Sequence, residues 1–519
     1  MGISRLGRAA ACTVGASLAL LAASPVAASA DQWGQPAATG RSLAPGTRFF
    51  VPPPATGSFA QIVSLLRSRD RKDAMLLAEM EATPQAVWFT GTNPSGSQQS
   101  PDQVAWAVSR TLLEARVEQA VPVMVIYNIP GRDCAQYSSG GAPTDVAYQA
   151  WVSGFAQGLG DAKAVVLVEP DALANLPSDC GAGAYAGEAN PPTDASRLAD
   201  INFDVTTLEA DPNASVYLDG GNSAWQSVGS SAPKTGQTAP APFTDIPGMA
   251  ERLAAAGVAK AQGFFLDVSN YQYTQNSVYY GTWVSDCLAI AAGNGGSFQN
   301  CPSQYWNGGP AGTEIANLLG PWTGGPLDRY GVWSDTTTTA DLNVSGIDAQ
   351  YAGSLGSTVP TTHFVIDTSR NGQGPNDMSA YGTGTVYNQP PSVIGTLQAG
   401  NWCNPPGAGL GLRPTADTSS VSPLLDAYLW VKTPGQSDGQ CDAAGGVRAW
   451  DNSSSTPSIA GWPASSSSTF NQFDPLWSIQ TGTVLTDPAA GTWFPQQALQ
   501  LAQLANPPLS LSRPLFGHH

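Results

Sequence analysis

The sequence predicts an α/β fold in which buried parallel strands and amphipathic helices alternate around a (β/α) barrel. Three observations lead to this prediction. Apolar runs of strand length recur along the chain, most of them end at an aspartate, and segments with helical periodicity lie between several of them. Strands of a parallel sheet are buried on both faces and therefore appear as continuous apolar runs. In such a barrel, functional side chains lie on the loops that follow the strands.

Two apolar stretches, residues 123–134 and 165–171, break into a polar loop at Asp133 and at Asp171. Paired carboxylates at the mouth of a barrel are suited to the hydrolysis of glycosidic bonds. Either aspartate alone could equally well cap the helix that follows it. Four further runs also end in a polar residue, and they span residues 214–219, 262–267, 362–367 and 424–432.

Three segments between these runs have one apolar face at helical spacing. Residues 144 and 145 provide a cap for the second helix, and Pro247 opens the third. The three faces consist of Val104, Val108, Leu112 and Ala115, then Ala147, Trp151, Phe155 and Leu159, then Met249, Leu253 and Ala256.

Residues 1–30 have the features of a signal peptide, namely Arg5 and Arg8 followed by an apolar stretch and a small-residue cleavage site at Ala30. We therefore expect a secreted, extracellular protein whose mature chain begins at Asp31. No later stretch is long and apolar enough to span a membrane, so we expect no membrane partner. A Ser-rich stretch at 453–468 is interpreted as a loop, and residues 31–519 as a single catalytic domain with a core at about 45–510 and no separate carbohydrate-binding module.

The chain is acidic, with 22 Lys and Arg against 39 Asp and Glu and a formal net charge of −17. Binding to nucleic acid depends on cationic contacts to phosphates, so this balance argues against a nucleic-acid partner. Only 12% of the residues are charged and 15 are tryptophan, which favours a neutral polymer such as a polysaccharide. Most of the tryptophans are nevertheless expected to lie in the core.

Six cysteines follow the signal segment, and an even number in an exported protein indicates disulfides. Pairing by neighbourhood gives Cys134–Cys180, Cys287–Cys301 and Cys403–Cys441, one of many possible connectivities. A zinc site has little support because the chain has no CxxC motif and only three histidines. A serine hydrolase is also disfavoured, because His363 is the one histidine within the domain and is expected in the middle of a strand. We expect no metal and no cofactor.

Several motifs together resemble glycoside hydrolase family 6, a family of secreted cellulases. Residues 127–141 (YNIPGRDCAQYSSGG) resemble its first signature and residues 166–173 (VLVEPDAL) its second. The resemblance extends from about residue 88 to about residue 508. Shorter matches occur at residues 217–219, 401–404, 409–414 and 430–439.

The resemblance implies a distorted (β/α) barrel with long covering loops that cleaves β-1,4-glucosidic bonds with inversion. Asp171 corresponds to the general acid, and Asp133 to a neighbouring charge that raises the pKa of this acid. Asp438 matches the residue often proposed as the base, and Ser139 the serine that helps hold the attacking water. Tyr127 matches a tyrosine that presses on the distorted sugar.

The same resemblance assigns residues to substrate binding. Trp88, Trp225 and Trp402 match tryptophans that stack on glucose units, although a core position for Trp88 and Trp402 is an alternative. Lys432 matches a residue that binds sugar hydroxyls. Asp219, which begins the motif after the predicted third strand, is also assigned to substrate binding. The pairs 134–180 and 403–441 also fit the family and tether loops of the active site.

Three positions depart from the family pattern. Asn222 replaces a histidine, Asp267 an asparagine and Gln436 a glutamate, and all three lie around the sugar subsites in the resemblance. We therefore expect an inverting β-1,4-glucanase that acts on cellulose or a related β-glucan as a monomer. The alternative is a glucan-binding protein with weak catalysis. Long loops at 270–361 and 439–487 could roof the cleft and favour the cellobiohydrolase mode over the endoglucanase mode.

Overall fold

The computed structural model describes residues 41–93, 96–135, 137–180, 183–224, 246–293, 295–304, 331–333, 344–391, 393–394, 397, 400–441 and 474–510. The predicted signal peptide and Trp225 lie outside these residues, as do large parts of the two loops expected to roof the cleft.

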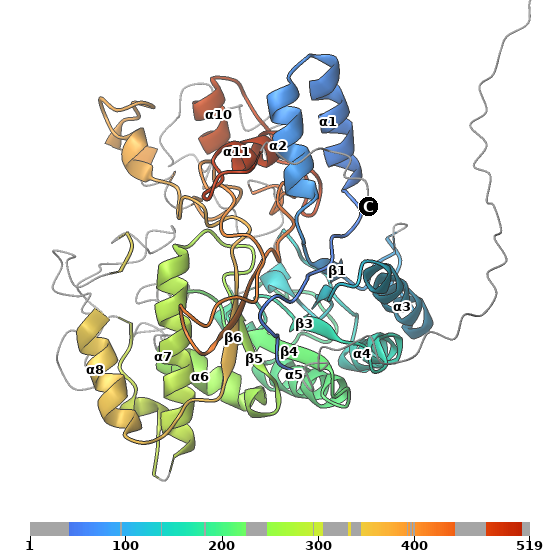
Figure 1. The fold of residues 1–519 in the computed structure, drawn as a ribbon, viewed down its shortest axis with the longest axis vertical. Helices are drawn as coiled ribbons and strands as arrows, with labels where there is room; N and C mark the ends of the chain where they lie inside the picture. The colour runs from blue at the N-terminus through green and yellow to red at the C-terminus, as the bar shows by residue number, and fades with distance from the viewer. Residues whose placement is uncertain are drawn as a thin grey trace, which may run out of the picture. The chain divides into compact units, whose positions relative to one another are not determined.

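The centre of the fold is a curled sheet of seven parallel strands whose spatial order follows their order in the sequence (Figure 1). Helices lie between consecutive strands, so the predicted α/β barrel architecture is confirmed. Neighbouring strands pair in parallel throughout, with one irregularity between β6 and β7. The strands are β1 (Val87–Phe89), β2 (Val123–Ile126), β3 (Ala164–Val168), β4 (Ala214–Asp219), β5 (Gly263–Leu266), β6 (His363–Asp367) and β7 (Leu425–Leu429).

The first and last strands approach each other at the seam of the barrel. The backbone N–H of Ala86, just before β1, donates to the carbonyl of Trp430, just after β7, at 2.9 Å. The indole of Trp88 donates to the carbonyl of Val431 at 2.8 Å. Strand β1 has only three residues, and the sequence analysis did not predict it because so short a run has no pattern of its own.

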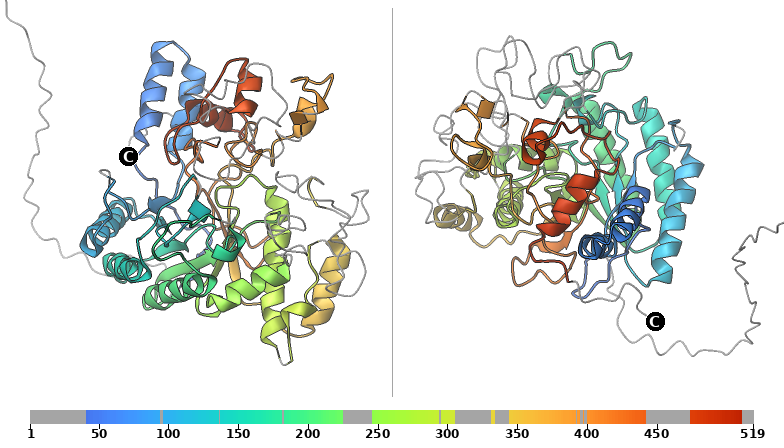
Figure 2. Two further views of the ribbon diagram at one scale, coloured as in Figure 1. Left: turned by 180° about the vertical axis from the view of Figure 1, so that it is seen from behind. Right: turned by 90° about the horizontal axis from the view of Figure 1, so that it is seen from above.

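The long helices follow the strands and cover the outside of the sheet, as Figure 1 and the two views in Figure 2 show. Ser100 forms a capping box with Gln103 at the start of α3, and Thr144 caps α4 as predicted. These outer helices are α3 (Pro101–Val117), α4 (Asp145–Leu159), α5 (Asp194–Leu208), α6 (Ile246–Ala255), α7 (Thr274–Ala292) and α8 (Val344–Leu355).

A second group of helices joins the two ends of the described chain. Helices α1 (Thr56–Arg67) and α2 (Arg71–Glu81) pack with α11 (Pro495–Gln503), and α10 (Pro475–Thr481) lies close to them (Figure 1). Gln61 of α1 accepts a hydrogen bond from the indole of Trp493 at 2.8 Å.

Both faces of the central strands are buried, as the continuous apolar runs predicted. On β2, Met124 and Ile126 pack outward with the helices, whereas Val123 and Val125 belong to the cluster inside the barrel. The apolar faces predicted for the helices also pack into the core, and Phe155 of α4 is fully buried. Among the described residues, the structure shows no helix long and apolar enough to cross a bilayer.

The position predicted for His363 is wrong in one respect. It is the first residue of β6, not a residue in its middle, because Thr362 does not join the ladder. Its Nδ1 lies 2.8 Å from Oδ1 of Asp426, whose other oxygen accepts hydrogen bonds from Tyr217 and Gln262. This cluster lies near the N-terminal end of β6, opposite to the strand ends that carry the acidic residues.

All three predicted disulfides are confirmed, namely Cys134–Cys180, Cys287–Cys301 and Cys403–Cys441. The first joins the loop after β2 to the loop after β3. The second connects the end region of α7 to the short helix η4 (Phe298–Asn300). The third links two segments that surround Asp438.

Helix α7 contains an acidic residue whose burial should make stability depend on pH. Burial, with a further contribution from Asp348 of α8, raises the pKa of Asp286 to about 7. A pKa above the unfolded value means that the native state binds more protons, so stability falls as pH rises from about 4 to about 7.

We therefore expect D286N to stabilise the protein at about pH 8 by roughly 1–3 kcal/mol, with little effect near pH 4. Urea unfolding at the two pH values measures this difference. D161N, at an exposed position, serves as the control. An unchanged pH dependence of stability in D286N would contradict the prediction.

Candidate active site

Carboxylates at the C-terminal ends of strands hold the segments that follow neighbouring strands. Asp219, the last residue of β4, accepts the backbone N–H groups of Leu173 at 3.0 Å and Ala174 at 2.8 Å. Its other oxygen accepts the N–H of Gly221 at 3.0 Å. Because Leu173 and Ala174 follow Asp171 closely, the charge of Asp219 fixes the turn that carries the predicted acid.

Asp367, the last residue of β6, does the same for the segment after β7. Its two oxygens accept the N–H groups of Val431 at 3.1 Å and Lys432 at 2.9 Å. The N–H of Ser369 adds a third hydrogen bond at 2.9 Å. The position of Lys432 therefore depends on a buried carboxylate of the neighbouring strand.

The backbone turns sharply at the two predicted catalytic aspartates. Asp133 has φ 56° and Asp171 has φ 70°, and Glu169 between them in sequence has φ 51°. L-amino acids adopt this left-handed region rarely, and it is costly unless the surroundings impose it. The hydrogen bonds to Asp219 supply such a constraint at Asp171. Asp133 is held by its own bond, because its Oδ2 accepts the N–H of Ser138 at 2.6 Å.

The electrostatic environment keeps a proton on Asp171. Burial raises the pKa of Asp171 well above its usual range, and the negative charges of Asp219 and Asp133 raise it further. The charge of Lys432 lowers the pKa of Asp171. Burial also raises the pKa of Asp133, to about 6, against the lowering effects of the Ser138 hydrogen bond and of Arg132.

Asp438 lies among cationic and hydrogen-bond-donating groups that lower its pKa. Although burial alone would raise the pKa of Asp438, the charges of Arg370 and Lys432 and the Tyr271 hydrogen bond hold it at about 2. Arg370 Nη1 lies 2.9 Å from Oδ1 of Asp438, and Lys432 Nζ lies 3.3 Å from the same oxygen. The hydroxyl of Tyr271 donates to Oδ2 at 2.6 Å, as does the N–H of Asn404 at 3.0 Å.

The sequence analysis did not identify Arg370 or Tyr271 as site residues. The guanidinium of Arg370 is fully buried and lies over the ring of Tyr271, with 4.0 Å between Cζ and the ring centroid. It also donates to the carbonyl of Ser269. An arginine three residues beyond a strand-ending aspartate, in a chain with few cations, was the available signal.

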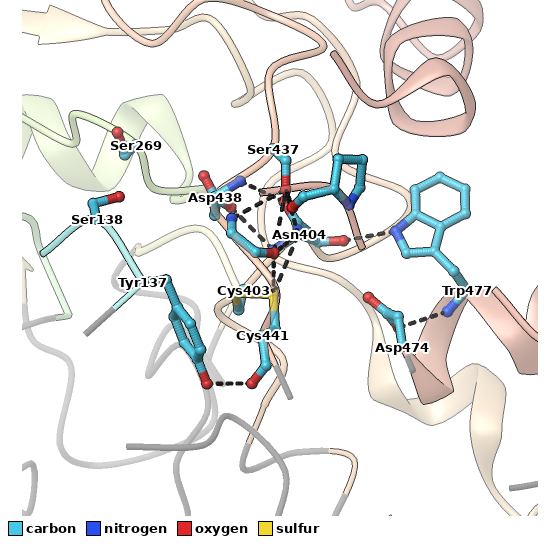
Figure 3. Close-up of a disulfide and its surroundings, with 12 residues drawn as sticks. Tyr137, Ser138, Ser269, Cys403, Asn404, Ser437, Asp438, Cys441, Asp474 and Trp477 are labelled. Carbon is cyan, nitrogen blue, oxygen red and sulfur yellow. Dashed lines mark hydrogen bonds between the residues drawn. A yellow bond between two sulfur atoms is a disulfide. The ribbon is translucent and has the colours of Figure 1, made fainter. Parts of the chain in front are cut away.

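Asn404 connects Asp438 to the third disulfide, as Figure 3 shows. Its Oδ1 accepts the N–H of Asp438 at 2.7 Å, and its Nδ2 donates to the carbonyl of Gly439 at 2.9 Å. Trp477 of α10 donates to the Asn404 carbonyl at 2.7 Å. Gly439 has φ 140°, and a Cβ atom there would come within 2.5 Å of Tyr137, so the segment requires glycine at this position.

Two of the predicted aromatic residues lie together beside the acids. The rings of Trp88 and Tyr127 meet edge to face with 5.4 Å between centroids, and Arg132 lies over the ring of Tyr127. Trp88 is only partly buried, so part of its ring remains accessible. Trp402 is also partly buried, and the centroid of its ring lies 6.1 Å from that of Tyr137.

The remaining predicted residues are placed as follows. Ser139 is exposed and follows Ser138, which bonds to Asp133. Asn222 is buried, and its Oδ1 accepts the N–H of Ala224 at 2.9 Å. Asp267 is buried and accepts a hydrogen bond from Asn371. Gln436 is partly buried, and its backbone pairs with that of Trp493 in an isolated antiparallel β-bridge.

In the described part of the chain, no group of three or more His, Cys, Asp and Glu side chains is arranged to hold a metal ion.

A family model described as Glycosyl hydrolases family 6 matches residues 44–505. The chain belongs to this family. The match covers the barrel, the strand-end carboxylates and all three disulfides, and it confirms the family predicted from the signatures.

Curated relatives include enzymes of two kinds. The chain is 28% identical over 406 residues to Endoglucanase A of Cellulomonas fimi, and the alignment covers 78% of this chain and 59% of that protein. It is 26% identical over 392 residues to "Probable 1,4-beta-D-glucan cellobiohydrolase C" of Aspergillus niger, over 74% of this chain and 60% of that protein. The chain therefore spans less than two thirds of the length of these relatives.

Solved structures share the fold. The catalytic core domain of the cellobiohydrolase Cel6A from Chaetomium thermophilum matches with a TM-score of 0.52 and 20% sequence identity. The match covers 90% of this chain and 99% of that chain.

Replacing Asp219 should change the proton affinity of Asp171. D219N removes the negative charge that, after burial, raises the pKa of Asp171 most, so the pKa of Asp171 falls. We expect the alkaline limb of the pH–rate profile to move to lower pH, with a loss of kcat. Initial rates on soluble β-glucan over a pH series measure both.

D367N is the matched control, since Asp367 holds the Lys432 segment through the same kind of hydrogen bonds. It should lower stability without the same shift of the alkaline limb. Equal shifts in both variants would contradict the role given to Asp219.

Proposed function

We propose that this protein is a secreted β-1,4-glucanase that hydrolyses cellulose or a related β-glucan with inversion at the anomeric carbon. The observation that carries the proposal is the divergence of pKa among neighbouring carboxyl groups. Asp171 retains its proton, Asp133 titrates at about 6, and Asp438 is ionised. A protonated acid beside ionised carboxylates is the arrangement that glycoside hydrolysis requires.

In this mechanism Asp171 donates its proton to the glycosidic oxygen as the bond to the leaving sugar breaks. Positive charge then develops on the anomeric carbon, and the carboxylate of Asp133 stabilises it. Tyr127, held between Trp88 and Arg132, provides a rigid aromatic surface against the distorted sugar. The turn fixed by Asp219 keeps the proton of Asp171 in place, so the enzyme does not have to reorganise during the reaction.

Water attacks from the opposite face of the sugar, with Ser139 as the candidate residue that helps to hold it. Asp438 is the candidate base. Its pKa of about 2 and its bonds to Arg370, Lys432 and Tyr271 make it a weak proton acceptor. These contacts support a role in which Asp438 attracts and orients the water electrostatically while the released proton passes on to solvent.

Substrate binding is assigned to aromatic and polar groups along the strand ends. The partly accessible rings of Trp88 and Trp402 are suited to stacking on sugar rings, and Lys432 is suited to bind their hydroxyls. Trp225 is proposed on the family resemblance alone, because it lies outside the described residues. Asn222 and Gln436 replace ionisable side chains of the family pattern, so we expect an altered subsite preference with the acid intact.

Secretion is supported by the N-terminal sequence and by the three disulfides. The proposed partner is the polysaccharide itself, bound by a monomer.

Removing the acid tests the central step. D171N should lower kcat on soluble β-glucan by roughly 10²–10⁴-fold, the usual contribution of a general acid, and should leave glucan binding intact. Reducing-end release and affinity gel electrophoresis measure the two properties. The loss should be much smaller on an aryl cellobioside whose leaving group needs no protonation.

A D171N variant as fast as the parent on β-glucan would overturn the mechanism. A parent protein that binds glucan but releases no sugar would instead favour the glucan-binding alternative. Proton NMR of the first product from cellohexaose tests inversion, which requires the α-anomer.

The mode of attack gives a further prediction. Loops long enough to roof the cleft favour cellobiohydrolase action, in which cuts occur at chain ends. The viscosity of carboxymethylcellulose should then fall slowly relative to the sugar released. A rapid early fall in viscosity would identify an endoglucanase.

A further inference from the structure

Three fully buried polar side chains form a line behind the segment that carries Asp171. Tyr148 of α4 stands between Glu169, the residue directly after β3, and Asp204 of α5. Its hydroxyl lies 2.9 Å from Oε1 of Glu169 and 2.5 Å from Oδ2 of Asp204. The same Oε1 accepts the backbone N–H of Asn128 at 2.8 Å. The line therefore reaches the segments of both Tyr127 and Asp171.

The number of protons in this line follows from its contacts. A tyrosine hydroxyl has one proton and can donate it to only one of two carboxyl groups. If Glu169 and Asp204 were both ionised, one of the two short contacts would join an oxygen to an oxygen with no hydrogen between them. Such a contact is costly because all three side chains are fully buried, where an unsatisfied polar contact is not screened by bulk solvent. One of the two carboxyl groups must therefore be protonated.

The surroundings place this proton on Asp204. Burial raises the pKa of Glu169, but the N–H of Asn128 that its Oε1 accepts and the charge of Arg132 both favour the ionised form. Among the described residues, each carboxyl group has one oxygen without a hydrogen-bond partner, but only that of Glu169 accepts a bond from a backbone N–H. The charged groups that act on Asp204 are both acidic, namely Glu169 and Asp200, which lies one turn earlier on α5.

We propose that Asp204 is a positioning residue that stays protonated and donates to Tyr148. Tyr148 then donates to an ionised Glu169, and this carboxylate holds the Tyr127 segment beside the Asp171 turn. The inference rests on the proposed roles of Tyr127 and Asp171. The direction of titration agrees with it. Burial raises the pKa of Asp204 well above its usual range, and Glu169 and Asp200 raise it further, against the Tyr148 hydrogen bond.

A pair of amide substitutions tests which carboxyl group carries the proton. In D204N the amide N–H₂ replaces the acid as the donor to Tyr148, so kcat/KM on β-glucan should stay within about threefold of the parent. E169Q loses the charge and buries an amide N–H₂ where Oε2 has no hydrogen-bond partner among the described residues. Its kcat/KM should fall by at least about tenfold, with an altered pH–rate profile. D204V, which cannot donate, should resemble E169Q.

An infrared difference spectrum provides a readout that does not depend on turnover. At about pH 8 the parent should show the carbonyl band of a protonated carboxylic acid that is missing from D204N, and thermal melts confirm that each variant is folded. The opposite pattern, with E169Q active and D204N impaired, would overturn the assignment, as would the absence of a difference band. A parent protein that shows the band but has no activity would contradict the proposed function, whereas the assignment of the proton to Asp204 would still hold.

Discussion

Hydrogen bonds from backbone N–H groups to buried strand-end carboxylates determine the geometry of this candidate active site. Asp219 holds the turn after Asp171, Glu169 holds the segment after β2, and Asp367 holds Lys432. Each carboxylate bonds to a segment that follows an adjacent strand, so the loops are fixed to the sheet itself. A charged acceptor makes these bonds stronger than those between neutral groups. The strained backbone at Asp133 and Asp171 is sustained within this frame.

The same carboxylates also create the electrostatic contrast on which the proposed chemistry depends. The charge of Asp219 adds to burial in raising the pKa of Asp171 and outweighs the lowering effect of Lys432. Arg370 and Lys432 are concentrated on Asp438 instead. In a chain with few cations, placing two of them on one carboxylate leaves Asp171 more strongly affected by the charges of Asp219 and Asp133 than by Lys432. The position of the positive charges thus determines which acid retains a proton.

Much of this arrangement could be predicted from the sequence. The apolar runs gave six of the seven strands, and the signatures located Asp133, Asp171 and Asp438. Strand β1 was missed because its three residues are stabilised by the seam contacts with Trp430 and Val431, which lie far away in the sequence. Arg370 and Tyr271 were missed for the same reason, since their function appears only when the loops after β5, β6 and β7 meet. The Asp204–Tyr148–Glu169 line also depends on the packing of two helices against β3.

The disulfide between Cys134 and Cys180 adjoins Asp133 on one side and closes the loop after Asp171 on the other. The sheet needs no covalent bond to form, because its seven strands pair through the backbone alone. Reduction of this disulfide would therefore leave the barrel and its hydrogen bonds in place and remove only the covalent link between the loop of Asp133 and the loop that follows Asp171. The redox state of the surroundings therefore bears on how firmly these two loops are joined, whereas the pairing of the strands does not depend on it.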